Sequence, residues 1–265
     1  YARGVLDLNR KTGDNAALRI NALVNVADDQ GNQIDKIGIA PTFRWGIGTA
    51  DEFSAGLYHL EYKNGIPYGL PWFNNGVASV WKADSYYGAE SDYMQGGTSY
   101  GTFSHVHRFG GPSQGELRTA LRIASYERDQ RASAIRFCTQ NNDPSCPAQV
   151  TKDNFGPDTI LRRSGDTGVQ AKVMNMDTRY LQSDYSGKHR WFGLEHSVQA
   201  GVDLADEQFE NFAAAVPAGV SLAKPTTTVG TPDDGARVSE ALRALTRNRT
   251  FEAQALGLYA QDLLT

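Results

Sequence analysis

The sequence predicts an all-β fold: an antiparallel transmembrane β-barrel with short turns at one end and long loops at the other. Between residues 18 and 27, apolar and polar side chains alternate with one exception, Leu23, so a strand here has one apolar and one polar face. The polar face carries Arg19, which suits a wall between lipid and a wet lumen. Short and long connections also take turns along the chain, as they do in outer-membrane barrels.

The composition agrees with this fold and makes other classes of protein less suitable. The 265 residues include 27 Gly and 12 Tyr, a balance that fits barrels better than helical proteins. Hydrophobic residues make up 40%, and no run is apolar enough for a transmembrane helix. The net charge of -4 gives no reason to expect nucleic acid as a partner. The chain opens at Tyr1 without an apolar leader segment, as a mature protein or a fragment would.

Nine strands are expected, joined by turns and loops of very different length. The predicted strands cover about residues 3–11, 15–27, 36–47, 52–63, 97–109, 115–128, 171–186, 189–206 and 251–265. Short connections are predicted near 13–15, 48–51, 110–115 and 186–188, and long ones at 28–35, 64–96, 129–170 and 207–250. Nine strands with two open edges cannot close in lipid, where unpaired backbone is costly. We therefore expect residues 1–265 to be one partial barrel domain of a larger barrel.

The third predicted strand alternates most clearly, with Ile37, Ile39 and Phe43 on one face. Pro41 lies on the same face and removes one ladder hydrogen bond, so a bulge or a local break is expected there. Phe43 and Trp45 lie near a short turn and are candidates for an aromatic girdle, although ordinary packing predicts the same residues.

Several polar residues fall on strand faces without pointing to a ligand. The arginines on the polar faces are Arg19, Arg44, Arg118 and Arg122. We expect them to form networks with carboxylates or to contact a domain inside the barrel. His105 and His107 share a face at a spacing that can chelate a metal, but the sequence shows no third ligand, so no metal site is predicted.

Two loop features stand out. Cys138 and Cys146 lie in polar loop sequence and predict a local disulfide, which implies an oxidising compartment. Closing so short a loop stabilises it by about 2–3 kcal/mol on the chain-entropy model. A metal pair is disfavoured, because no His or further Cys accompanies these cysteines. Residues 236–247 predict a short helix, with apolar residues on one side.

Motifs along most of the chain resemble TonB-dependent outer-membrane receptors, in particular the catecholate ferric-siderophore type. They are Gly4–Arg10, Gly13–Asp14, Ala17–Ala22, Gly38–Pro41, Gly65–Trp72, Glu116–Thr119, Tyr126–Asp129, Ala132–Phe137, Gly201–Asp203 and Gly257–Asp262. The Gly-Leu-Pro-Trp run at 69–72 points to the catecholate branch. The resemblance implies a barrel of about 22 strands around a plug, embedded in outer-membrane lipid of a Gram-negative bacterium. Energy for import would come from the TonB–ExbB–ExbD complex, acting through the plug.

The same resemblance implies that the chain is the first part of the barrel alone, because it shows no plug, no TonB box and no aromatic C-terminal strand. No cofactor is expected, since iron arrives inside the siderophore. The chain also shows no Gly-x-Ser-x-Gly elbow and no phosphate loop, so we expect a receptor and not an enzyme.

A ferric tris-catecholate complex is flat-sided, aromatic and anionic, so its site needs basic side chains and aromatic faces. The long loops offer both. The candidate ligand-binding residues are Tyr68, Trp72, Trp81, Tyr86, Tyr87, Tyr93, Arg128, Arg131 and Arg136. The alternative is that these aromatics pack the loops together and that the arginines pair with Asp129, Asp153 or Asp158.

Two other functions stay open from the sequence. The cargo of such a receptor could be a hydroxamate siderophore, haem or cobalamin. A soluble all-β carbohydrate-binding or hydrolytic protein would instead need two apolar inner faces and paired carboxylates near aromatics. The alternation of short and long connections and the arginines on the polar faces argue against that second reading.

Overall fold

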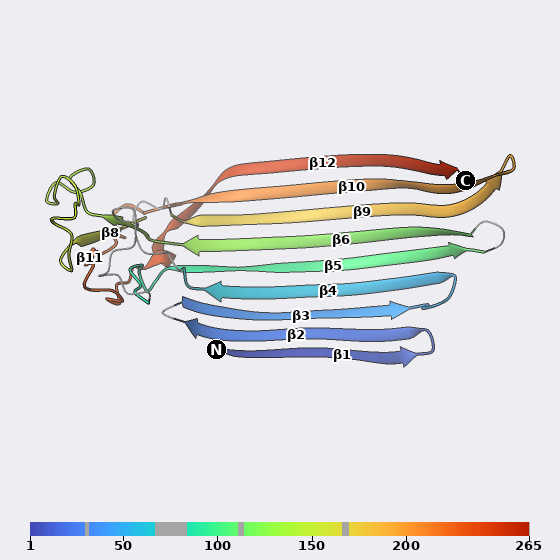
Figure 1. The fold of residues 1–265 in the computed structure, drawn as a ribbon, viewed down its shortest axis with the longest axis horizontal. Coiled ribbons are helices and arrows are strands. Elements are labelled where there is room, and N and C mark those ends of the chain that lie inside the picture. Colours follow the sequence, from blue (N-terminus) through green and yellow to red (C-terminus); the bar gives the residue numbers. More distant parts are fainter. Residues whose placement is uncertain (30–31, 67–83, 111–113, 166–169, 265) are drawn as a thin grey trace.

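The long strands of the protein form one antiparallel sheet in the computed structural model, which describes all residues except 30–31, 67–83, 111–113, 166–169 and 265. The nine strands are β1 (Ala2–Gly13), β2 (Ala16–Asp29), β3 (Asn32–Trp45), β4 (Asp51–Asn64), β5 (Tyr93–Phe109), β6 (Gln114–Arg131), β9 (Lys172–Trp191), β10 (Leu194–Ala215) and β12 (Ala244–Leu264). Each lies beside the next long strand of the chain, with β1 and β12 at the edges (Figure 1). The predicted all-β fold and its nine strands are confirmed.

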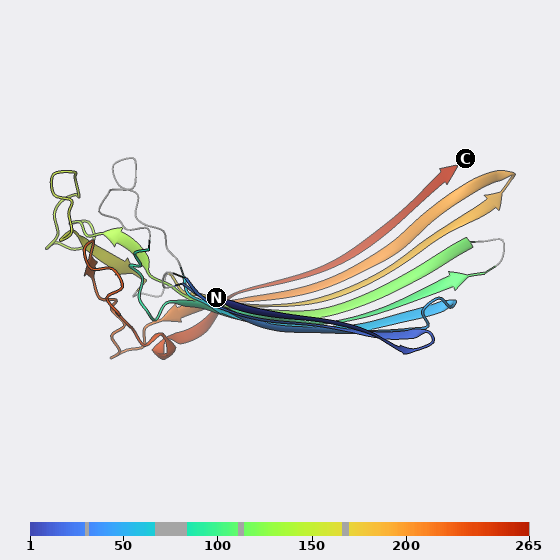
Figure 2. The same cartoon turned by 60° about the horizontal axis from the view of Figure 1, so that its bottom comes forward.

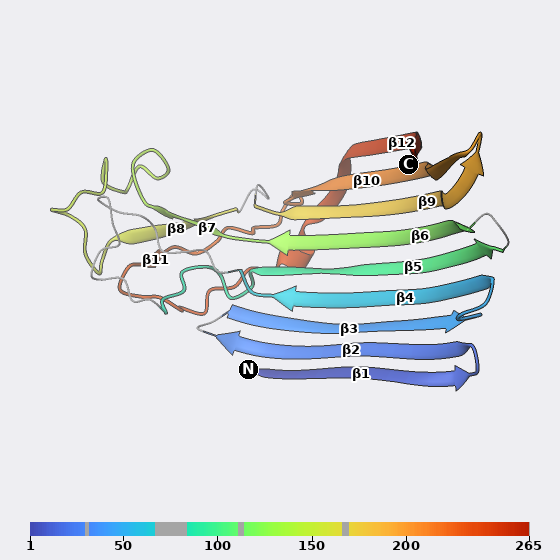
Figure 3. The ribbon, with the colours of Figure 1, turned by 45° about the vertical axis from the view of Figure 1, so that its right-hand side comes forward.

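The two ends of the sheet differ. At the turn end, short connections join the strands, and at the loop end the chain makes long excursions after β4, β6 and β10 (Figure 1). The sheet curves along its strands, and the loops gather at one end (Figure 2). There a small sheet forms from β7 (Ala134–Phe137), β8 (Ile160–Ser164) and β11 (Thr227–Thr228), beyond the ends of the long strands (Figure 3). No helix in the described residues is long and apolar enough to cross a membrane.

Strand register places one apolar row straight across the sheet. Its members, each opposite the next, are Leu18, Phe43, Ala55, Phe103, Leu121, Leu181, Leu204 and Leu256. The adjacent row, on the other face, holds Arg19, Thr42, Gly56, Thr102, Arg122, Tyr180, Ala205 and Ala255. We call these the apolar face and the polar face. Because Phe103 and Leu256 stay exposed, the apolar face is a surface that a barrel wall would turn toward lipid.

A continuous line of aromatic and histidine rings crosses the apolar face near the turn end. Neighbouring ring centroids lie 4.4–6.3 Å apart along Phe43, Trp45, Phe53, His105, His107, Phe109, Tyr185, His189, Trp191 and His196. Rings at this level lie where the apolar band ends, which is the position of an aromatic girdle. The girdle expected at Phe43 and Trp45 is present, and four histidines complete it.

The strands run further than predicted at the loop end. The loop expected at 28–35 is wrong, because β2 and β3 continue to Asp29 and Asn32 and pair there. Likewise β10 reaches Ala215 and β12 begins at Ala244, well inside the loop expected at 207–250. The 22 residues of β10 span about 70 Å, more than the roughly 30 Å of hydrocarbon in a bilayer. Polar strand ends that extend beyond the apolar part of the sheet therefore resemble loops in sequence.

One predicted turn is also wrong. Strand β9 runs through Ser186-Gly187-Lys188 without a break, and the hairpin turns at Phe192 and Gly193, with φ of 54° and 82°. Two left-handed residues form a hairpin turn that matches the strand twist, but an aromatic residue at the first position is unusual. The turn expected at 110–115 falls mostly outside the described residues, although β5 ends at Phe109 and β6 begins at Gln114.

The break expected at Pro41 is present. Strand β3 pairs with β4 at Ile39 and again at Thr42, but not at the two positions between them. The register is the same on both sides of the gap, so the strand is interrupted without a bulge. Pro41 still faces Ile20 of β2, on the side where no N–H from residue 41 is needed.

The prediction of a helix at 236–247 is wrong. Only a 3₁₀ turn forms, at Glu240–Leu242. The segment before it is held extended by other loops, since Glu90 N–H donates to the carbonyl oxygen of Ala236 and Val238 N–H donates to Ser91 Oγ. These tertiary hydrogen bonds outweigh the helical pattern of the sequence.

Candidate functional site: the polar face and the loop assembly

The structure places only some of the predicted ligand residues in reach of a ligand. Tyr68, Trp72 and Trp81 lie outside the described residues. Tyr87 is buried beside Leu161 and Val229, and its hydroxyl donates to the carbonyl oxygen of Val229 at 2.7 Å. This placement favours the packing role for Tyr87. The hydroxyl of Tyr86, which is half-buried, donates to the carbonyl oxygen of Ala89 at 3.3 Å.

The arginines predicted as ligand residues divide into paired and exposed side chains. Arg131 is buried and pairs with Asp129 at 2.7 Å, the pairing that the packing alternative expects. Tyr93 also donates its hydroxyl to Asp129, at 3.1 Å. Arg128 donates to Gln130 on the polar face. Arg136 is exposed on β7, so of this group it offers the most accessible cation in the described residues.

The polar face carries a cluster that the sequence did not indicate. The rings of Tyr58 and Tyr100 stack with centroids 4.6 Å apart, and the guanidinium carbon of Arg122 lies 4.2 Å from the centre of the Tyr100 ring. Arg122 also donates to the hydroxyl of Tyr126 at 2.9 Å. We call Tyr58, Tyr100, Arg122 and Tyr126 the tyrosine–arginine cluster. It combines a delocalised cation with aromatic faces, the two features that an anionic aromatic ligand requires.

Two of the other predicted polar-face arginines, Arg19 and Arg44, form the carboxylate networks that the sequence predicts. Arg19 donates to both carboxylate oxygens of Asp7, at 3.0 and 2.8 Å. Arg44 and Arg108 both pair with Glu52, near the turn end. Of the four polar-face arginines that the sequence names, Arg122 is the one set among tyrosine rings.

Buried ion pairs join the loops at the other end of the sheet. Lys224 Nζ contacts Asp92 Oδ1 at 3.1 Å and Glu240 Oε1 at 3.3 Å, and its side chain is only 1% exposed. Arg243 Nε donates to Glu240 Oε2 at 2.5 Å and extends the network. In a second ion pair, Arg163 Nη1 donates to Asp234 Oδ2 at 3.0 Å and Arg163 Nη2 donates to Asp234 Oδ1 at 2.7 Å. We call these six residues the loop clamp.

The electrostatics of the loop clamp favour its charged form. Burial alone would raise the pKa of Glu240, but the hydrogen bond from Arg243 and the charge of Lys224 outweigh it and hold that pKa below its usual value. Burial would likewise raise the pKa of Asp234, which the hydrogen bonds from Arg163 and the Ala236 N–H instead hold low. Glu240 and Asp234 are therefore ionised at neutral pH.

The predicted disulfide joins Cys138 to Cys146, with Cα atoms 5.7 Å apart. We expect the double variant C138S/C146S to loosen residues 138–147, since the cross-link stabilises its short loop by about 2–3 kcal/mol. Limited proteolysis should then cut this loop faster, while the strands on either side stay protected. Equal cleavage of the oxidised protein and the variant would contradict the expectation.

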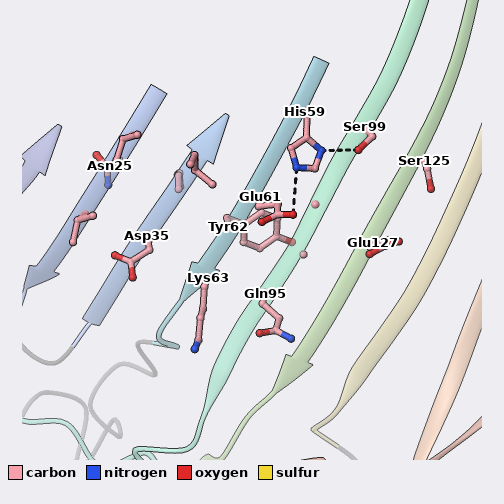
Figure 4. Close-up of a pocket in the computed structure, with 16 residues that line it drawn as sticks. Asn25, Asp35, His59, Glu61, Tyr62, Lys63, Gln95, Ser99, Ser125 and Glu127 are labelled. Atoms are coloured by element: carbon pink, nitrogen blue, oxygen red, sulfur yellow. Dashed lines mark hydrogen bonds and ion pairs between the residues drawn. The ribbon is translucent and has the colours of Figure 1, made fainter. Parts of the chain in front are cut away.

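A groove of about 700 Å³ runs over β2 to β6 near the loop end. His59 lies in this groove (Figure 4). Its Nδ1 is 2.8 Å from Ser99 Oγ, and its Nε2 is 3.3 Å from Glu61 Oε1. His59 and Glu61 follow Leu57 at every second position, so they continue the apolar face where it becomes polar near the loop end. His59 and Glu61 therefore lie on the opposite side of the wall from the tyrosine–arginine cluster.

Comparisons with known proteins agree with the fold. No family model matches the chain. It is 27% identical over 228 residues to the catecholate siderophore receptor Fiu of Escherichia coli K12, a match covering 80% of this chain and 28% of that receptor. The crystal structure of Fiu in its open form superimposes with a TM-score of 0.72 at 21% identity, covering 99% of this chain and 40% of that one. The fold of this chain is therefore that of a siderophore-receptor barrel.

Other matches extend the likeness. The siderophore receptor PiuA of Acinetobacter baumannii superimposes with a TM-score of 0.71 at 16% identity, over 99% of this chain and 38% of that one. A stretch of 75 residues is 33% identical to "Probable TonB-dependent receptor BfrD" of Bordetella pertussis, over 26% of this chain and 10% of that protein. The predicted resemblance to TonB-dependent siderophore receptors is confirmed. The chain spans less than a third of the length of the curated relatives it matches.

Proposed function

We propose that this chain forms part of the barrel wall of an outer-membrane receptor that imports a ferric siderophore of the catecholate class. The observation that carries the proposal is the match to a catecholate siderophore receptor over 80% of the chain. The TonB–ExbB–ExbD complex, a plug and outer-membrane lipid are the partners that this function requires. The apolar face, with its ring girdle, supplies the lipid-facing surface.

The chemistry of the polar face supports the catecholate class. A ferric catecholate presents flat rings and negative charge, and binding it makes and breaks no covalent bond of the protein. Arg122 offers a weakly hydrated planar cation, and Tyr58 and Tyr100 offer stacked aromatic surface beside it. Arg136 adds an exposed cation among the loops, where a ligand would first arrive.

The first experiment measures ligand binding to the intact receptor in detergent by quenching of tryptophan fluorescence. A ferric catecholate, a ferric hydroxamate and both iron-free siderophores are titrated side by side. We expect saturable quenching by the ferric catecholate alone. Quenching by the hydroxamate alone would assign the cargo to that class, and quenching by neither would remove the siderophore proposal.

Replacing Arg122 with Gln is expected to weaken ferric-catecholate binding by about 10- to 100-fold, because a hydrogen bond or contact to a charged group contributes about 1.5–3 kcal/mol. Arg19→Gln is the matched control, since Arg19 lies on the same face but is held by Asp7. Fluorescence titration of both variants checks the expectation. An equal affinity in the two variants would exclude Arg122 from the binding surface.

A further inference from the structure

Three potential metal ligands meet at the turn end of β4 and β5. Asp51 Oδ1 lies 2.8 Å from Nε2 of His105 and 2.7 Å from Nδ1 of His107. One ligand atom from each residue fits within a span of 4.8 Å. The sequence shows the two histidines but not the carboxylate, which is contributed by the neighbouring strand 54 residues earlier.

The two imidazole rings are held in place by their neighbours. The His105 ring stacks on Phe53 with centroids 4.4 Å apart and planes 8° apart. The His107 ring meets the edge of Phe109 at 4.6 Å. Both rings belong to the ring girdle, whose packing restricts their rotation. A ligand set held in this way loses less side-chain entropy when an ion binds.

The ligand set has a definite chemical preference. Two imidazole nitrogens and one carboxylate oxygen suit a divalent transition metal such as Zn²⁺, which takes three protein ligands and leaves its fourth position to water. The side chains of Asp51, His105 and His107 are 49%, 34% and 36% exposed, so an ion and its water can reach them. Ca²⁺ and Mg²⁺ prefer all-oxygen ligands and fit the site less well.

We propose that Asp51, His105 and His107 bind one Zn²⁺-like ion on the apolar side of the wall, beside the turn between β3 and β4. The carboxylate accepts hydrogen bonds only, so each facing ring nitrogen now carries a proton. When an ion binds, each imidazole carries its proton on the other ring nitrogen instead, so that the facing nitrogen gives its lone pair to the ion. Bonds of about 2.0–2.1 Å around a tetrahedral ion place ligand atoms about 3.3 Å apart, so the Asp51 oxygen moves roughly half an ångström away from each of the two ring nitrogens. The bound ion cross-links β4 to β5.

Zinc binding to the intact receptor in detergent, after treatment with a chelator, tests this proposal. Isothermal titration with Zn²⁺ should show one site that is lost or weakened at least 100-fold, as a rough lower bound, in both His107→Gln and Asp51→Asn, since even residues that only support a ligand change affinity by about 10- to 100-fold. His189→Gln is the matched control, because His189 lies in the same girdle but contacts the hydroxyl of Tyr185. It should bind Zn²⁺ like the unaltered protein.

The Co²⁺ form supplies a second readout that does not depend on affinity. Visible absorption bands of tetrahedral Co²⁺ should appear in the unaltered protein and in His189→Gln, and should be absent from His107→Gln. Resistance of each variant to proteolysis confirms that it is folded. Unchanged Zn²⁺ binding in His107→Gln and Asp51→Asn, or Zn²⁺ binding by none of the proteins, would overturn the proposal and leave Asp51 as a hydrogen-bond acceptor only. Neither result depends on the siderophore.

Discussion

Replacing Lys224 with Ala should open the loop assembly. The Lys224 ammonium is buried and contacts Asp92, Glu240, Ser133 Oγ and the carbonyl oxygen of Ala132. Without it, two buried carboxylates lose their shared cation. Removing one partner of a buried ion pair destabilises a structure by about 3–5 kcal/mol, because the remaining charge is left uncompensated. Hydrogen exchange of amides near residues 84–92 and 222–243 should therefore quicken at least 100-fold, as a rough estimate.

Two further variants separate charge from shape in this experiment. Lys224→Met keeps most of the side-chain volume but removes the charge, and it should open the loops nearly as much as Lys224→Ala does. Lys11→Ala is the control, because Lys11 is exposed and pairs only loosely with Asp14, at 3.5 Å. If Lys224→Met exchanged like the unaltered protein, the clamp would owe its stability to packing and not to its charges.

Much of the fold could be predicted because the membrane imposes a simple rule on a barrel wall. Inside the lipid band, side chains must alternate, and strands such as β3 and β6 show this plainly. Outside the band the rule no longer applies. Asp28 and Asp29 continue β2 as polar residues, and Phe192 forms a turn that its residue type does not suggest. The errors in strand bounds therefore lie at the strand ends, outside the apolar band, whereas the helix expected at 236–247 is replaced because of hydrogen bonds to neighbouring loops.

The candidate sites were harder to predict, because they depend on strand register. Tyr58, Tyr100 and Arg122 come from three strands, and the patterns of β4 and β5 are mixed. Asp51 meets His105 and His107 only because β4 pairs with β5 in one register. A register between residues 51–64 and 93–109 would have revealed the Asp51 site and the Tyr58–Tyr100 stack, and placing Arg122 beside them also needs the register of β5 with β6. The alternation within one strand fixes the face on which a residue lies, but it does not distinguish registers that differ by two residues.

The loop clamp should also weaken in acid. The folded pKa values of Asp234 and Glu240 lie below their ordinary values of 3.8 and 4.5. In the open loops these carboxylates regain ordinary values and bind protons more readily. The contribution of each residue to loop stability is therefore fully present above its ordinary pKa, and is lost as the pH falls through the lower, folded value.

Hydrogen exchange of residues 222–243, corrected for the intrinsic pH dependence of exchange, measures this loss between about pH 7 and pH 3. The free energy of loop opening should stay level in the upper part of this range and fall below pH 4.5, where the first of the two carboxylates has its ordinary pKa. Asp234→Asn should open more easily at neutral pH, because Arg163, whose side chain is 0% exposed, loses its anion. The free energy of loop opening in the Asp234→Asn variant should also depend less on pH. A loop that grows more stable as the pH falls would contradict the assignment, since it would mean that protonated carboxylates favour the closed state.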